Sequence, residues 1–255
     1  MHHADVLDQL VALSRTLGDP ANDYAMLGEG NTSARASDAT FWVKASGTEM
    51  RTIDANGFVE VDFKRVLAIL DAPVLSDAEI KLGLSGAKVD AASPAHPSVE
   101  TVLHALCLQL DGVNFVGHTH PTAINGITCS VGFEAAFAGR LFPDEIVVCG
   151  PAPVLVPYVD PGPPLARAVK ARIDVHIDTY GEVPKVIHMQ NHGLIALGRT
   201  AQQVANITDM AVKTARILAG TYALGGPRFM SAEAVARIHT RPDEHYRQKV
   251  IAPGA

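Results

Sequence analysis

The spacing of apolar residues along the chain predicts helices interspersed with short strands. Apolar positions three and four residues apart predict helices over 4–18, 63–70, 98–110, 121–130, 165–180, 201–224 and 231–239. Short runs of β-branched and aromatic residues predict strands over 41–44, 57–61, 113–117, 146–148, 154–156, 186–189 and 194–197. The segment 75–95 is rich in small and polar residues and is predicted to be mostly loop. Ser98 is the expected N-cap of the helix that begins there.

The order of these elements constrains the fold class. The regular strand–helix–strand alternation of a doubly wound parallel sheet is missing. No internal repeat and no Gly/Ser-rich linker interrupts the sequence. We therefore expect one α/β domain over residues 1–255, with a mixed or antiparallel sheet and helices on its faces. Its main body should span about residues 4–224, followed by a helical tail over 225–255.

Composition and charge narrow the class of protein. The 255 residues are 47% hydrophobic and 19% charged, which is ordinary for a globular protein and excludes a disordered chain. The net charge of −6 argues against nucleic acid as a partner, because nonspecific binding needs a basic surface. No apolar run reaches the roughly 18 residues of a membrane span, and no signal-peptide pattern opens the chain. A cytoplasmic protein without a membrane partner is expected.

The cysteines suggest no structural role beyond packing. Cys107, Cys129 and Cys149 are too few and too scattered for a disulfide framework or a zinc ribbon. All three lie in apolar stretches, so we expect buried thiols.

Histidines form the first candidate chemical site. His118 and His120 close a predicted strand, where residues i and i+2 point to the same face. Two imidazoles projecting together suit two ligands of one metal ion, although a pair of ordinary polar residues is the alternative. A third ligand must come from elsewhere in the chain. His192 is the best candidate, because Gly193 after it would let the backbone approach a site; His188 is its rival.

Glu100 is the candidate carboxylate. It lies in the first turn of a predicted helix, where the helix dipole favours its ionised form. The spacing to His104 is i, i+4, so both residues lie on one helical face. A solvent-exposed glutamate is the alternative interpretation. A functional role depends on Glu100 facing the metal.

Two loops of small residues, 28–31 and 46–48, are candidate anion sites. Their backbone N–H groups and short hydroxyls could cradle a negative charge, but loops of this composition are equally common as plain turns.

Taken together in order, five segments resemble the class II aldolase/adducin family, which includes fuculose- and rhamnulose-phosphate aldolases and ribulose-phosphate 4-epimerases. The segments are Gly30-Asn31-Thr32-Ser33, Lys44-Ala45-Ser46-Gly47-Thr48, His96-Pro97-Ser98-Val99-Glu100-Thr101, Val116-Gly117-His118-Thr119-His120-Pro121 and Gln190-Asn191-His192-Gly193-Leu194-Ile195. The segments 97–101 and 156–162 look most similar to rhamnulose-phosphate aldolase-like members. The resemblance implies a three-layer αβα sandwich with a central mixed, largely antiparallel sheet. It also implies a homotetramer with active sites at subunit interfaces.

The resemblance also implies roles for individual residues. His118, His120 and His192 would bind a divalent metal, most simply Zn²⁺, with Mn²⁺, Co²⁺ or Fe²⁺ as alternatives. Glu100 matches the acid/base carboxylate, which is Glu in aldolases and Asp in epimerases. Tyr246 matches a proton donor that acts from the neighbouring subunit.

Several positions match places where sugar-phosphate members hold the phosphate: Asn31, Ser46, Gly47 and Ser98. One departure matters for the substrate. Phosphate-binding members have two serines before the carboxylate, whereas this chain has Ser98 followed by Val99. One hydroxyl donor is therefore missing.

The function that this pattern favours is that of a metal-dependent aldolase. Such an enzyme cleaves a ketose or a ketose phosphate through an enediolate whose charge the metal stabilises. Decarboxylation of a keto or hydroxy acid is the alternative, because loss of carbon dioxide also leaves an enolate. A sugar-phosphate 4-epimerase and a non-catalytic, adducin-like interaction protein rank below these two.

Overall fold

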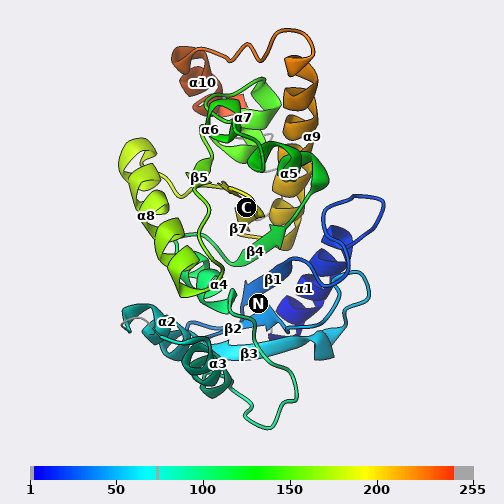
Figure 1. Cartoon of the computed structure of the whole chain (residues 1–255), viewed down its shortest axis with the longest axis vertical. Coiled ribbons are helices and arrows are strands. Elements are labelled where there is room, and N and C mark those ends of the chain that lie inside the picture. Colours follow the sequence, from blue (N-terminus) through cyan, green and yellow to red (C-terminus); the bar gives the residue numbers. More distant parts are fainter. Residues whose placement is uncertain (1–2, 73–74, 244–255) are drawn as a thin grey trace.

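A seven-stranded sheet forms the centre of the fold (Figure 1). The computed structural model describes residues 3–72 and 75–243. The strands lie in the order β3-β2-β1-β4-β7-β6-β5, and neighbours pair antiparallel except β5 with β6. Their bounds are β1 (Asn31–Arg35), β2 (Thr40–Lys44), β3 (Phe58–Asp62), β4 (Phe115–Thr119), β5 (Val154–Val156), β6 (Val186–Met189) and β7 (Gly193–Gly198).

Helices cover both faces of this sheet, and Figure 1 shows α8 and α9 on opposite sides of it. One buried cluster joins α2, α4 and α8 to one face, and a second joins α1, α5 and α9 to the other. The three-layer αβα prediction with a largely antiparallel sheet is therefore confirmed. The helices are α1 (His3–Leu17), α2 (Phe63–Asp71), α3 (Asp77–Gly86), α4 (Thr101–Leu108), α5 (Thr122–Thr128), α6 (Phe133–Ala136), α7 (Pro143–Cys149), α8 (Pro163–Tyr180), α9 (Ala201–Tyr222) and α10 (Ala232–His239), with a 3-10 turn η1 (Ala55–Gly57).

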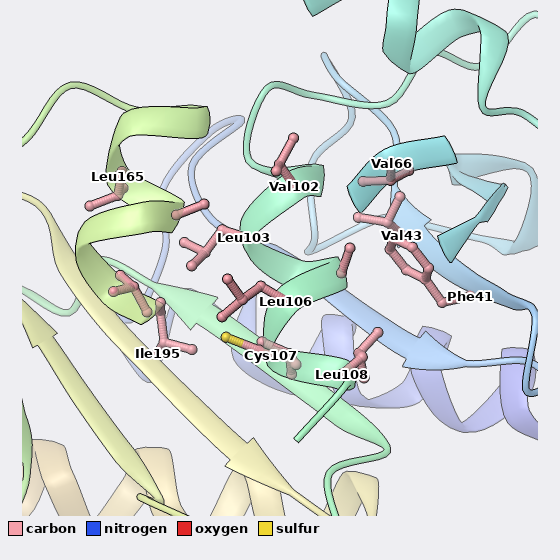
Figure 2. Close-up of a cluster of buried hydrophobic side chains, with 14 of the residues drawn as sticks. Phe41, Val43, Val66, Val102, Leu103, Leu106, Cys107, Leu108, Leu165 and Ile195 are labelled. Carbon is pink, nitrogen blue, oxygen red and sulfur yellow. The ribbon is translucent and has the colours of Figure 1, made fainter. Parts of the chain in front are cut away.

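Helix α4 is the centre of the first cluster. All of its residues are buried, as expected for a helix that is apolar nearly all round. Figure 2 shows Leu103, Leu106 and Cys107 of α4 gathered with Leu165 of α8 and Ile195 of β7. This packing fixes the N-terminal end of α4, where Glu100 lies.

The opposite face depends on a glycine in the middle strand. A Cβ atom on Gly117 of β4 would lie 2.7 Å from Cγ1 of Val204 and 3.0 Å from Cδ1 of Leu17. The bare backbone therefore lets α1 and α9 approach the sheet closely.

Two segments differ from the prediction. Part of 75–95, predicted as loop, forms α3, which begins with a capping box between Ser76 and Glu79 and buries Ile80 and Leu84. The predicted strand 146–148 lies within α7 instead. Pro143 at the start of that helix and two acidic residues in its first turn favour a helix over the β-branched preference of 146–148.

Smaller corrections concern helix ends and cysteines. Ser98 is not the N-cap of α4, because the helix begins at Thr101 and Glu100 occupies the cap. The strand predicted over 113–117 runs over Phe115–Thr119.

Cys129 is exposed, whereas Cys107 and Cys149 are buried as expected. Burial raises the pKa of each buried thiol to about 12.

Within 3–72 and 75–243, no helix has the length and apolar character needed to cross a bilayer. The single-domain organisation over 1–255 stays a prediction. Within the expected C-terminal tail, the described part contains α10.

Gly117→Val should destabilise the fold by about 1–3 kcal/mol, because the added methyl groups force Leu17 and Val204 apart. Urea unfolding measures this free energy. The control is Gly220→Ala in α9, where nothing lies within 4 Å of the new Cβ atom. That variant should be as stable as the parent or more stable by up to about 1 kcal/mol. Equal stability of Gly117→Val and the parent would contradict the close packing.

Candidate metal centre

Three histidines converge at the C-terminal end of β4, the middle strand of the sheet. His118 lies in β4, His120 follows this strand directly, and His192 lies in the turn between β6 and β7. One ring nitrogen of each lies within 4.8 Å of the others. Nε2 of His118 and Nε2 of His120 are 3.1 Å apart. Two nitrogens bound to one tetrahedral zinc ion lie about 3.3 Å apart, so this spacing suits shared coordination.

The turn that carries His192 is shaped by its neighbours. Asn191 has a positive φ of 53°, which asparagine tolerates better than most residues. A Cβ atom on Gly193 would lie 2.4 Å from the carbonyl oxygen of Thr119 and 2.7 Å from Cδ2 of His120. Only glycine lets the β7 backbone approach the end of β4 this closely. The glycine after His192 thus brings the two segments together, as its position predicts.

A hydrogen bond orients His118, and burial keeps His120 neutral. The carbonyl oxygen of Leu194 lies 2.9 Å from Nδ1 of His118 and can only accept, so Nδ1 carries the hydrogen. Nε2 of His118 then faces the cluster and Glu100, and a metal would take the place of any proton on this nitrogen. Burial, together with the charges of neighbouring histidines, lowers the pKa of His120 to about 3. His120 is therefore neutral at pH 7, the form that binds metal.

Glu100 lies against the same cluster. Its Oε1 is 3.1 Å from Nε2 of His192 and 3.5 Å from Nε2 of His118. Burial alone would raise the pKa of Glu100, but the charge of His118 and hydrogen bonds from both histidines hold it well below its usual range. The carboxylate is therefore ionised beside the three imidazoles.

The other oxygen of Glu100 binds Asn31, whose Nδ2 lies 2.6 Å from Oε2. Oδ1 of Asn31 is hydrogen-bonded to Nε2 of His104, and Nδ1 of His104 lies 2.6 Å from Oγ of Ser33. Burial lowers the pKa of His104 to about 3. Sequence reasoning did not include His104 and Ser33 among the site residues, although the spacing of Glu100 and His104 was a signal.

Lys44 brings a positive charge toward the site. Its side chain is buried, and Nζ lies 3.4 Å from the carbonyl oxygen of Gly28. Burial lowers the pKa of Lys44, and the field of Glu100 partly offsets that effect. The amino group of Lys44 thus lies within electrostatic reach of the Glu100 carboxylate.

The segments that carry Ser46 and Ser98 lie side by side. A β-bridge joins Ala45 to Pro97, and the N–H of Ser46 donates to the carbonyl oxygen of His96 at 2.9 Å. Ser46 and Gly47 are exposed. Oγ of Ser98 is buried and has no hydrogen-bond partner among the described residues.

Other candidates lie outside this group. The rival ligand His188 is buried in β6, where its ring stacks on Phe137 with centroids 4.0 Å apart. Val99 is 41% exposed, at the position where a second serine would supply a hydroxyl. Tyr246 lies outside the described residues.

Comparison with known proteins identifies the family. Residues 8–219, most of the chain, match the family described as Class II Aldolase and Adducin N-terminal domain. The chain belongs to this family. The resemblance seen in the ordered motifs is therefore confirmed.

Individual relatives show how far the likeness extends. Over 204 residues, or 77% of the chain, it is 28% identical to "Uncharacterized oxidoreductase YuxG" of Bacillus subtilis (strain 168). The chain spans only 27% of the length of that relative. The N-terminal Class II Aldolase domain of a conserved protein from Thermoplasma acidophilum is 27% identical, with a TM-score of 0.64 over 83% of this chain and 92% of that one. An L-fuculose 1-phosphate aldolase shares the fold at 16% identity, with a TM-score of 0.67 over 96% of this chain and 97% of that one.

If the three histidines hold a metal ion, His118→Ala should weaken its binding by more than the roughly 10–100-fold that loss of a supporting hydrogen bond costs. Elemental analysis after dialysis against Zn²⁺ measures the bound metal. His188→Ala is the matched control, because it removes a buried histidine outside the cluster. Metal bound at unit stoichiometry in His118→Ala would refute the ligand assignment.

Proposed function

We propose that this protein is a metal-dependent carbon–carbon lyase that cleaves a ketose or a ketose phosphate. The observation that carries this proposal is the position of Glu100. Its Oε1 lies 3.1 Å from His192 and 3.5 Å from His118, at the edge of the three-histidine cluster. A proton-transfer group and a metal-binding group are thereby adjacent, as a reaction that creates negative charge next to a carbonyl requires.

His118, His120 and His192 would hold the metal, and three neutral imidazoles suit Zn²⁺ best, with Mn²⁺, Co²⁺ or Fe²⁺ as alternatives. When bound, a divalent metal supplies Lewis acidity that neutralises the charge left on the substrate oxygens as the bond breaks.

Glu100 would move the protons. In an aldol cleavage, the hydroxyl next to the breaking bond loses its proton as that oxygen becomes a carbonyl. The bonding electrons pass to the carbon beside the existing carbonyl, and that carbon must then gain a proton. An ionised Glu100 can accept the first proton or, once protonated, return one to the carbon.

The loops beside the cluster would hold the rest of the substrate. Ser46, Gly47 and Ser98 lie on two adjacent loops. The hydroxyl of Ser98 is buried without a partner among the residues described, and Lys44 contributes a positive charge nearby. These features support an anionic or polyhydroxylated substrate.

Decarboxylation of a keto or hydroxy acid is the second candidate, and Val99 favours it. An isopropyl group occupies the position of the second phosphate-binding serine and is 41% exposed. Loss of carbon dioxide requires the same stabilisation of negative charge beside a carbonyl. It does not require a phosphate site.

The family suggests further properties of the whole protein. We propose a homotetramer, to which Tyr246 would contribute a proton donor from the neighbouring subunit. The cytoplasmic location and the absence of a nucleic-acid partner stay predictions from the sequence.

Glu100→Gln should lower kcat by about 10²–10⁴-fold, because the amide cannot accept or return a proton. The variant should keep its metal, since the three histidines remain. Steady-state kinetics and elemental analysis measure the two properties. The control is Glu182→Gln, which changes a glutamate paired with His239 and should leave kcat unchanged. Full activity in Glu100→Gln would eliminate the proposed role.

A product-resolved assay by mass spectrometry tests the reaction itself. The panel contains fuculose and rhamnulose phosphates, their unphosphorylated ketoses, and keto acids of similar size, each with and without chelator. We expect chelator-sensitive release of the two aldol fragments. Chelator-sensitive release of carbon dioxide instead would select the decarboxylase, and an inert protein across the panel would argue against both candidates.

A further inference from the structure

A chain of buried hydrogen bonds leads from Glu100 into the protein interior. Nδ2 of Asn31 lies 2.6 Å from Oε2 of Glu100, and Oδ1 of Asn31 is bonded to Nε2 of His104. Nδ1 of His104 lies 2.6 Å from Oγ of Ser33. The relative exposures of Asn31, His104 and Ser33 are 5%, 1% and 0%, so water does not compete for these atoms.

The donor and acceptor of each bond in this series can be assigned in only one way. Nδ2 of Asn31 donates to Oε2 of Glu100, so the NH₂ group of Asn31 faces the carboxylate. The amide oxygen of Asn31 then faces His104, which must donate from Nε2. A neutral His104 with its hydrogen on Nε2 has a lone pair on Nδ1, and the hydroxyl of Ser33 donates to it. Each of these three hydrogen bonds therefore has one donor and one acceptor.

The opposite orientation of Asn31 is strongly unfavourable. It would place Oδ1 at the position of Nδ2, 2.6 Å from a carboxylate oxygen, where two acceptors repel. The bond from His104 to Oδ1 keeps the amide in the favourable orientation. This bond also occupies the end of the Asn31 side chain that faces away from Glu100.

We propose that His104 is a positioning residue that, through Asn31, holds Glu100 against the three histidines. The chemical consequence of this assignment rests on the proposed lyase function. It also gives Asn31 a role in addition to the phosphate contact that the family resemblance implies. Both polar ends of Asn31 are engaged within the protein, so its amide also serves the carboxylate.

Two substitutions at position 104 separate this role from simple packing. His104→Leu fills the space but cannot donate to Asn31, whereas His104→Gln can place an amide N–H near the position of Nε2. We expect His104→Leu to lower kcat by about 10–100-fold with little change in KM, and His104→Gln to recover most of the activity. His188→Leu is the matched control, because it replaces another buried histidine that lies outside the cluster. It should leave kcat and KM unchanged.

A second readout does not depend on turnover. Crystal structures of the metal-free parent and variants give the distance between Oε1 of Glu100 and Nε2 of His192, which is 3.1 Å here. This distance should lengthen in His104→Leu and return in His104→Gln. If His104→Leu does not fold, His104→Phe, which keeps an aromatic ring but has no N–H to donate, should displace Glu100 in the same way.

The two readouts distinguish the two proposals. If the parent cleaves nothing on the substrate panel but Glu100 moves in His104→Leu, the lyase function fails and the positioning role stands. An unmoved Glu100 and an unchanged kcat in a folded His104→Leu protein would overturn the positioning role. The same conclusion would follow if His104→Gln were as impaired as His104→Leu.

Discussion

The pairing of β4 with β1 and β7 is the constraint on which the site depends. Asn31 lies opposite His118 on one side of this strand, and Leu194 lies opposite Thr119 on the other. Because side chains alternate between the two faces of a sheet, a slip of one residue in either pairing would turn His118 away from its partners. The first ladder joins residues 87 positions apart in sequence, Asn31 and His118, and the second joins residues 75 positions apart, Thr119 and Leu194.

Helix α4 positions Glu100 beside the three histidines. Its fully buried, apolar body is held between α2, α8 and the sheet, so Glu100 at its N-terminal end has little freedom to move (Figure 2). An ionised carboxylate at a partly buried position is costly unless it is paired and hydrogen-bonded. His118, His192 and Asn31 offset that cost, so the stability of the core and the charge of the site depend on the same helix.

The parts of the site that depend on residues close together in sequence could be predicted from the sequence. The i, i+2 spacing placed His118 and His120 together, and the glycine after His192 indicated a close approach of backbone. The predictions failed where contacts between residues far apart in sequence determine the structure. The β-branched residues of 146–148 favour a strand in isolation, yet they form part of α7. The bond between Ser33 and His104 joins residues 71 positions apart, so no local pattern could reveal it.

The backbone contact at Gly193 limits how this protein can change over evolutionary time. Any side chain at position 193 would collide with Thr119 and His120, so every substitution of this glycine is unfavourable. Position 193, where the turn meets β7, is therefore restricted to glycine. The exposed residues Ser46 and Val99 are under no such steric restriction and can change without a clash with the histidines.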